Sequence, residues 1–269
     1  IAHCGLCHSD VTIADGTAPA PMPVVLGHEA CGVVAELGPG VTSLAVGDHV
    51  MLTPIPPCHR CHWCVRGQHS LCVNGIGLMT QTLPDGSTPL RRGDEIVYHG
   101  LGVAGFAQQT IVLETGAVKI PHDIPLELVA VIGCAVQTGV GAALRTAAVA
   151  AGDTVLVMGL GGIGISVVQG ARIAGASRIV VSDPNSDRRD AAARFGATDA
   201  IDPTAVDVAE SVRALTGGIG VDHAFDAVGS SALVRTGVAA TRNGGPTALI
   251  GAGPIHDPLD ITRTALMRT

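Results

Sequence analysis

The sequence predicts an α/β protein of two domains, in which an irregular β domain is followed by a doubly wound parallel sheet. The 269 residues include 36 glycines and are 47% hydrophobic, which is enough to bury one large core or two ordinary ones. Up to about residue 136, short apolar runs are separated by Gly, Pro and Asp-Gly pairs, a pattern typical of irregular β structure. From residue 137 onward, strand-like and helix-like runs alternate, which predicts βαβ units.

Both domains contain segments whose hydrophobic pattern predicts individual elements. In the first domain, residues 1–136, the expected strands are Val24–Leu26, Val33–Leu37, Gly47–Leu52 and Gln109–Leu113. In the second domain, residues 137–269, the expected strands are Val155–Met158, Ile179–Ser182, Ala224–Asp226 and Ala248–Ile250. Helices are expected at Ile163–Ala174 and Asp187–Phe195. The face of the first helix that should pack on the sheet carries Ile163, Val167, Val168 and Ala171.

The charge distribution limits the classes of partner. The formal net charge is -7 and the few Lys and Arg residues are scattered, so no basic patch is available for nucleic acid or an anionic membrane. Two uncharged runs, residues 128–144 and 154–171, are broken by glycines and polar residues, unlike a membrane span of about 20 mostly apolar residues. No secretion signal is visible, so a cytoplasmic location and reduced thiols are expected.

Three cysteines stand three residues apart in the segment CHRCHWC, and a fourth follows eight residues later. This short lobe, about residues 58–72, predicts a closed structural zinc site formed by Cys58, Cys61, Cys64 and Cys72. Two disulfides or four free thiols would also account for the cysteines, but both are disfavoured without a secretion signal. A nucleic-acid-binding zinc ribbon would need more positive charge than Arg60 and Arg66 supply. Since the sulfur set is complete, we expect solvated histidines at His59, His62 and His69.

A second set of metal ligands is spread along the chain. Cys7 lies in GLCHSD (5–10), His28 in GHEA and Cys134 in IGCAVQTG. A Cys-His-Cys set leaves one tetrahedral position open, as a catalytic zinc requires. Singly, Cys134 is more often a buried small hydrophobe and His28 a core histidine, so only their conjunction supports the prediction. Asp10 is expected to orient His28 and Glu29 to lie behind the metal, unless both only cap turns or face solvent. The spare thiols are Cys4 and Cys31.

The segment TVLVMGLGGIGISVV (154–168) is predicted to form a strand, a glycine-rich turn and a helix. The N–H groups at such a helix N-terminus can bind the pyrophosphate of a dinucleotide. The residues expected there are Gly159, Gly161, Gly162, Ile163 and Gly164. Asp183 follows Gly164 by nineteen residues, where it can bind the adenosine ribose and repel a 2′-phosphate, which favours NAD over NADP. Alternatively, Asp183 only begins the turn SDPN, and Arg188 is a solvated helix residue rather than a ribose or phosphate contact.

These motifs together make the sequence closely resemble the zinc-dependent medium-chain alcohol dehydrogenases. CGLCHSD, GHE, the four-cysteine lobe, GCAVQTG and GLGGIG occur in the family's order and at its spacings over the whole chain. The resemblance implies a GroES-like β catalytic domain, a Rossmann domain and an active-site cleft between them. By motif position it implies a catalytic zinc ion on Cys7, His28 and Cys134, and a second, structural zinc ion in the lobe. It also places Ser9 against the substrate oxygen and His8 near the coenzyme pyrophosphate.

The implied reaction is the reversible oxidation of primary or secondary alcohols to aldehydes or ketones, with hydride transfer to NAD. Family members with a complete proton relay carry a histidine two residues after the Asp of the C-x-[ST]-D motif, whereas this chain has Thr12 there. A threonine hydroxyl can pass a proton on but cannot hold one at neutral pH. Proton transfer through ribose and water is therefore expected.

The expected substrate pocket is roomy and apolar. Pro54, Gly100 and Leu101 stand where relatives often carry aromatic side chains, and only 2% of the residues are aromatic, so secondary or bulky alcohols should be preferred to ethanol. The competing assignment is a glutathione-dependent formaldehyde dehydrogenase. It is disfavoured because VNGI (73–76) lacks the anion-binding arginine of that subfamily, although Arg91 or Arg92 could substitute.

Three competing classes of protein would differ in their metal ligands. A zinc-free reductase of the same superfamily need not retain Cys7, His28 and Cys134. The polyol-dehydrogenase branch usually has Glu at the third ligand position, where this chain has Cys134. A non-catalytic NAD-binding or zinc-binding module would hold one zinc ion per chain rather than two. Family chains begin earlier and continue beyond Thr269. The sequence is therefore interpreted as a partial chain that stops before the last Rossmann strand, with a homodimer or tetramer expected for the full-length parent.

Overall fold

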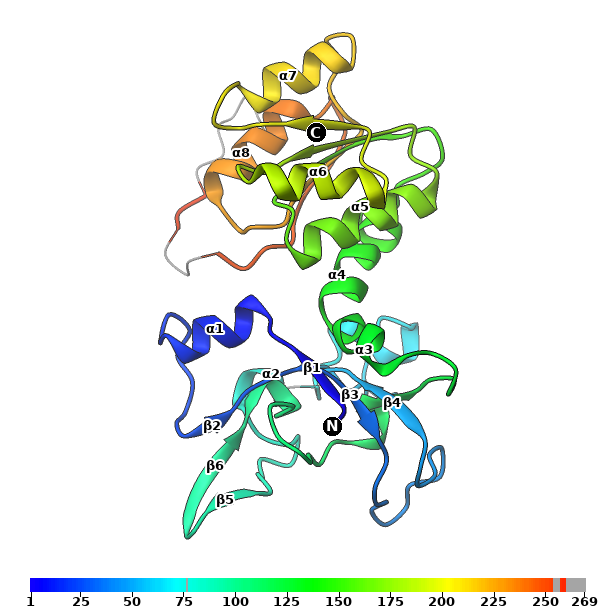
Figure 1. Ribbon diagram of the computed structural model, residues 1–269, viewed down its shortest axis with the longest axis vertical. Helices are drawn as coiled ribbons and strands as arrows, with labels where there is room; N and C mark the ends of the chain where they lie inside the picture. The colour runs from blue at the N-terminus through cyan, green and yellow to red at the C-terminus, as the bar shows by residue number, and fades with distance from the viewer. Residues whose placement is uncertain (76, 254–256, 260–269) are drawn as a thin grey trace. The chain divides into compact units, whose positions relative to one another are not determined.

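The computed structural model describes residues 1–75, 77–253 and 257–259. The chain divides into two compact units, Ile1–Ala135 (unit 1) and Val136–Thr269 (unit 2), which run from blue to green and from green to red in Figure 1. Residue 76, within the VNGI segment, and residues 254–256 and 260–269, at the end of the expected second domain, lie outside the described residues.

Unit 1 is built from short strands in two small sheets. The first is antiparallel, in the order β1 (His3–Gly5), β3 (Glu29–Val33), β4 (His49–Leu52) and β7 (Ala117–Lys119). The second has the order β2 (Val24–Val25), β6 (Glu95–His99) and β5 (Leu90–Arg92). Its helices are α1 (His8–Ala14), α2 (Gly77–Thr80) and α3 (Leu126–Val129). Single 3₁₀ turns occupy Cys64–Arg66, His69–Leu71, Gly100–Gly102, Glu114–Gly116 and Ala130–Gly133.

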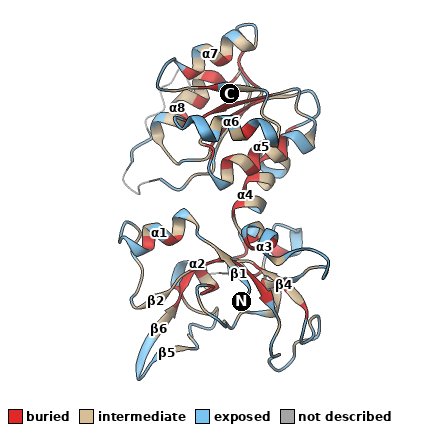
Figure 2. Cartoon of the chain, in the orientation of Figure 1, coloured by how far each residue is buried: buried red, intermediate tan, exposed pale blue. Residues whose placement is uncertain are grey.

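The core of unit 1 lies along β3 and β4 (Figure 2). Ala30, Val50, Leu52 and Val103 form one buried cluster. Cys31 packs with Val129 and Ala130 in a second cluster, on the segment that leads to Cys134. Apolar burial therefore fixes the start of β3 against the 3₁₀ turn before Cys134.

Two expected strands of unit 1 are wrong. The strand placed at Val33–Leu37 lies earlier, at β3, and only Val34 continues the pairing, by donating its N–H to the Asp48 carbonyl. Residues 109–113 form no strand. Ile111 is 59% exposed and Leu113 is 41% exposed, and the Thr110 hydroxyl donates to the Val103 carbonyl at 2.5 Å. The apolar alternation in this segment does not cover a sheet face, so the period-two pattern misled the prediction.

Unit 2 contains one five-stranded parallel sheet in the order β10-β9-β8-β11-β12. The strands are β8 (Thr154–Met158), β9 (Arg178–Ser182), β10 (Asp199–Ile201), β11 (His223–Asp226) and β12 (Thr247–Leu249). The helices between them are α5 (Gly162–Ala174), α6 (Ser186–Phe195), α7 (Val208–Leu215) and α8 (Ser231–Ala240). The first strand in sequence lies at the centre, where the strand order reverses and a ligand crevice is expected.

Helices cover both faces of this sheet because successive strand residues point to opposite sides. Val155 and Val157 of β8 pack in the cluster that contains residues of α5 and α6. Leu156 and Met158 pack in the cluster that contains residues of α7 and α8. All four expected strands and both expected helices of this unit are present within one residue of their predicted limits.

The segment before β8 is helical. α4 (Ala135–Gly141) continues into a π-helical turn at Ala142–Thr146. In the part of the chain that the structure describes, no single helix has the length and apolar composition to cross a membrane. One bent pair, Leu126–Gly133 with Ala135–Thr146, reaches that length and composition only as a pair.

Candidate functional site

Four potential metal ligands from distant parts of unit 1 meet at one point. Cys7 precedes α1, His28 and Glu29 stand at the start of β3, and Cys134 follows the 3₁₀ turn that ends at Gly133. One ligand atom of each residue lies within 4.8 Å of those of the other three. The distance from His28 Nε2 to Cys134 Sγ is 3.3 Å, although 106 residues separate them in the sequence. The fold thus brings together the three residues predicted as catalytic zinc ligands.

Asp10 holds the imidazole of His28 in place. Its two carboxylate oxygens each lie 3.3 Å from His28 Nδ1, and they also accept the backbone N–H groups of Gly27 at 2.8 Å and Cys7 at 3.2 Å. Asp10 is 1% exposed and His28 is 2% exposed. A carboxylate fixed in this way keeps the proton on Nδ1 and leaves Nε2 free to bind a metal ion.

The electrostatics of the site favour a thiolate at Cys7 and an imidazolium at His28. A hydrogen bond from the Cys134 thiol lowers the pKa of Cys7 to about 4, with a smaller lowering by His28. The pKa of Cys134 is raised, first by its hydrogen bond to Cys7 and then by burial. Burial lowers the pKa of His28, but hydrogen bonds to Asp10 and Cys7 outweigh it and raise the pKa to about 9.

Glu29 also belongs to this cluster. Its Oε1 accepts the N–H of Ala135 at 3.3 Å, and burial raises the pKa of its carboxyl group. The sequence placed Glu29 behind the metal as an outer-shell carboxylate. In the structure, a Glu29 oxygen lies within 4.8 Å of a ligand atom of each of the other three residues.

Residues of α1 flank these ligands. Ser9 is half-buried, with its hydroxyl 3.8 Å from Cys7 Sγ. The Thr12 hydroxyl donates to the Ser9 carbonyl at 3.0 Å, so it is engaged within the helix. His8, predicted near the pyrophosphate, is exposed.

The geometry of this cluster fits a tetrahedral zinc ion. Typical zinc distances to sulfur and nitrogen give ligand-to-ligand separations of about 3.6–3.8 Å, and here His28 Nε2 and Cys134 Sγ are 3.3 Å apart while all the donors lie within 4.8 Å of one another. The donors are the types that zinc prefers, and Asp10 completes the outer shell expected for a zinc-bound histidine.

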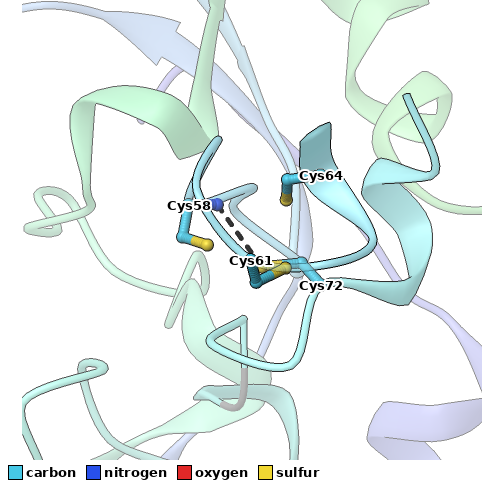
Figure 3. A group of neighbouring side chains, drawn as sticks. All are labelled: Cys58, Cys61, Cys64 and Cys72. Carbon is cyan, nitrogen blue, oxygen red and sulfur yellow. Dashed lines mark hydrogen bonds between the residues drawn. The ribbon is translucent and has the colours of Figure 1, made fainter. Parts of the chain in front are cut away.

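The four lobe cysteines form a second cluster (Figure 3). Their sulfurs lie within 4.8 Å of one another, and no disulfide joins them. Cys58 donates its N–H to Cys72 Sγ at 3.3 Å, and the Asn74 side chain donates to Cys58 Sγ at 3.2 Å. The Asn74 amide lowers the pKa of Cys58 to about 5, whereas burial raises that of Cys64 to about 12. Four sulfurs at this spacing, with N–H donors around them, fit a closed zinc site.

The lobe histidines do not join this cluster. His59, His62 and His69 are all exposed, and His62 Nδ1 lies 2.9 Å from Arg66 Nη1. Cys4 and Cys31 likewise lie outside both donor sets. Burial raises the pKa of Cys4 to about 11, so its thiol stays protonated near neutral pH.

The glycine turn in unit 2 joins β8 to α5. Gly159 has a φ of 88°, and a side chain there would collide with Val228. A Cβ atom on Gly164 would overlap the Gly159 carbonyl, so glycine at 164 allows the helix to approach the strand. Gly161, the residue before α5, has open space around its Cβ position, and no side chain caps the helix. Uncapped N–H groups beside open space fit a pyrophosphate.

Asp183 directly follows β9 and lies beside this turn. It is 4% exposed; its Oδ2 accepts the N–H of Leu160 at 2.8 Å and its Oδ1 that of Asn185 at 2.9 Å. The acidic residue therefore both begins a turn and contacts the glycine loop. Each carboxylate oxygen keeps a second lone pair for a ribose hydroxyl. Arg188 is 3.7 Å from Asp183 and 58% exposed.

Sequence reasoning missed two residues near these sites. Asn74 lies in the VNGI segment, and its amide donates to a lobe sulfur. Arg189 contacts the backbone on which Asp183 stands. The position of Asn74, two residues beyond the last lobe cysteine, could have indicated a hydrogen bond to a sulfur. No sequence signal distinguishes Arg189 from its neighbour Arg188.

Comparison with known proteins identifies the family. The family model for the alcohol dehydrogenase GroES-like domain matches residues 1–122, and the model for the zinc-binding dehydrogenase matches residues 162–269. S-(hydroxymethyl)glutathione dehydrogenase from Escherichia coli is 41% identical over 259 residues. The protein of the same name from Synechocystis is 40% identical over 260 residues. Each of these matches covers 93% of this chain and 69% of the relative.

Solved structures agree with this result. An alcohol dehydrogenase zinc-binding domain protein from Burkholderia ambifaria superposes with a TM-score of 0.92 at 37% identity. Benzyl alcohol dehydrogenase from Acinetobacter calcoaceticus superposes with a TM-score of 0.91 at 31% identity. Both comparisons cover 98% of this chain and 72% of the other. The predicted family and the GroES-like and Rossmann fold class are confirmed: the chain belongs to the zinc-dependent medium-chain alcohol dehydrogenases, a family of oxidoreductases.

Proposed function

We propose that this chain catalyses the NAD-linked, reversible oxidation of primary or secondary alcohols at a zinc ion held by Cys7, His28 and Cys134. The observation that supports this most strongly is the convergence of these three donors, with Glu29, within 4.8 Å. Three protein ligands leave a fourth position for substrate. A zinc ion bound there would act as a Lewis acid on the alcohol oxygen.

The residues around the ligands have distinct roles in this proposal. Asp10 keeps Nε2 of His28 directed at the metal by holding Nδ1. Ser9, 3.8 Å from Cys7 Sγ, is proposed to accept the alcohol proton at its hydroxyl oxygen. The next group along α1, the Thr12 hydroxyl, donates to a backbone carbonyl, and it cannot store a proton. The proton therefore leaves Ser9 through the cofactor ribose or water.

Unit 2 is proposed to bind NAD along the glycine turn. The pyrophosphate would rest on the N–H groups of α5, next to the open space at Gly161. Asp183 would accept the ribose hydroxyls, and its negative charge would repel the 2′-phosphate of NADP. When bound, NAD supplies the hydride acceptor.

The second candidate function is oxidation of a glutathione adduct, since two relatives are named S-(hydroxymethyl)glutathione dehydrogenase. The carboxylates of a glutathione adduct need a free cationic side chain to bind them. Arg92 is paired with Glu95 at 2.7 Å, and Arg91 Nη1 donates to the Thr88 and Leu90 carbonyls. Both arginines stand on β5, which Figure 1 shows at the end of unit 1 away from α1. This favours an uncharged alcohol.

A substrate panel tests the proposed function directly. With NAD and the zinc-loaded protein, NADH formation should be faster with benzylic and branched secondary alcohols than with ethanol, because no aromatic side chain is expected to narrow the pocket. Initial rates for ethanol, 2-butanol, benzyl alcohol and S-(hydroxymethyl)glutathione give the comparison. Activity that falls steadily from ethanol to bulkier alcohols would refute the roomy pocket. Turnover of the glutathione adduct alone would favour the second candidate.

The proton path can be tested at Thr12. Thr12→His should add a step near pH 6.5, the ordinary pKa of histidine, to the pH profile of alcohol oxidation. Neutral imidazole can take the proton, so the gain should appear above that pH and vanish below it. Thr12→Val, which removes only the hydroxyl, is the matched control and should leave the wild-type profile unchanged. An identical profile for Thr12→His and wild type would contradict a relay that ends at the ribose and water.

A further inference from the structure

The backbone at Asp183 is held by the side chain of Arg189. Nη1 of Arg189, on α6, donates to the carbonyls of Asp183 and Pro184 at 2.6 and 3.0 Å. Its Nη2 lies 3.0 Å from Oδ2 of Asp202, which directly follows β10. One guanidinium group thus ties the loop after β9 to the loop after β10.

The Arg189 side chain and the Asp202 carboxylate are both held in place by their surroundings. The Arg189 side chain is 15% exposed. Oδ1 of Asp202 accepts the N–H and hydroxyl of Thr204 at 2.9 and 2.6 Å, so the carboxylate that receives Arg189 has a defined orientation. The neighbouring Arg188 differs in each respect, because it is 58% exposed and its nearest carboxylate oxygen, on Asp183, is 3.7 Å away.

The position of Asp183 matters because its carboxylate is used twice. Oδ2 accepts the N–H of Leu160 in the glycine turn, and Oδ1 accepts the N–H of Asn185. Hydrogen bonds of this kind weaken steeply with small displacements. A shift of the loop after β9 would therefore disturb both the carboxylate and the glycine turn.

We propose that Arg189 is a positioning residue for the adenosine end of the cofactor: by clamping the carbonyls of Asp183 and Pro184 to Asp202, it keeps the Asp183 carboxylate aligned with the glycine turn. This inference rests on the proposed NAD-linked function. Arg189 acts through Asp183, because its terminal nitrogens contact the Asp183 and Pro184 carbonyls and the Asp202 carboxylate. Lysine could keep the charge but not the two-pronged contact.

The test compares Arg189→Gln, Arg189→Lys and the matched control Arg194→Gln, which removes an exposed positive charge from the last turn of the same helix. The affinities for NAD and for ADP-ribose are measured by calorimetric titration. KM and kcat for NAD are measured on the same variants. Arg189→Gln should weaken binding of both ligands about tenfold, the effect of losing one charge-assisted hydrogen bond. At saturating NAD, kcat should stay within about twofold of wild type. Arg189→Lys should recover part of the affinity.

Three results would overturn the inference: wild-type affinity in Arg189→Gln, an equal loss in Arg194→Gln, or a fall confined to kcat. If Arg189→Gln does not fold, Asp202→Asn, which keeps the arginine, should show a smaller loss of affinity for both ligands. Unchanged affinity in Asp202→Asn also overturns the inference. If the wild-type protein binds neither NAD nor ADP-ribose, the proposed function fails instead. The two failures are therefore distinguishable.

Discussion

Cys134→Ser is expected to lower the rate of alcohol oxidation at least about a thousandfold and to remove one of two zinc ions per chain. Metal charge stabilisation in a reaction of this kind is worth several kcal/mol, and each 1.4 kcal/mol is about a factor of ten in rate. Serine at this position replaces a thiolate, the preferred zinc ligand, with a poor one, while Cys7 and His28 remain. Zinc content by mass spectrometry and NADH formation, measured on the same preparation, check the result.

The matched control is Cys31→Ser. Cys31 is buried, and its thiol donates to the Leu126 carbonyl at 3.0 Å, outside the donor set. The same chemical change there should leave the zinc content and the rate near their wild-type values. Full activity and two zinc ions in Cys134→Ser would show that this residue is not a ligand. One zinc ion per chain in the wild-type protein would favour a non-catalytic module.

Cys64→Ser is expected to give the largest loss of stability. The lobe has only short 3₁₀ turns at Cys64–Arg66 and His69–Leu71, and such a loop needs metal bonds to keep its shape. Loss of this zinc should cost about 3 kcal/mol, which lowers the melting temperature by about 10 °C in a protein of this size. Thermal unfolding, limited proteolysis of the lobe and zinc content are the measurements.

His69→Gln provides the control for the lobe, because His69 is exposed and lies outside the four-sulfur cluster. It should keep both the zinc ion and the melting temperature. Comparing Cys64→Ser with His69→Gln thus distinguishes a zinc ligand from a residue that only lies near the zinc site. If Cys64→Ser retained the metal and His69→Gln lost it, the four-sulfur assignment would be wrong.

The sequence predicted unit 2 better than unit 1 for a physical reason. Strands that are buried on both faces, such as β8 and β9, are continuous apolar runs, and the glycine turn sets the limits of α5. In unit 1, β5 has two arginines among its three residues, and β5 and the first part of β6 are largely exposed. Short strands of this kind form because neighbouring segments pair with them, and their own sequence does not reveal that pairing.

The sequence alone determined the chemistry that each local segment can perform. The four lobe cysteines lie within fifteen residues, and the glycines at 159, 161 and 164 permit a tight turn between a strand and a helix. The cysteine spacing and the steric requirement for glycine each involve only residues that are close together in the sequence. Only the tertiary structure decided that Cys134 lies 3.3 Å from His28, and that Arg189 rather than Arg188 holds the Asp183 backbone. Such long-range contacts follow from apolar burial summed over whole sheets and helices, which no single motif encodes.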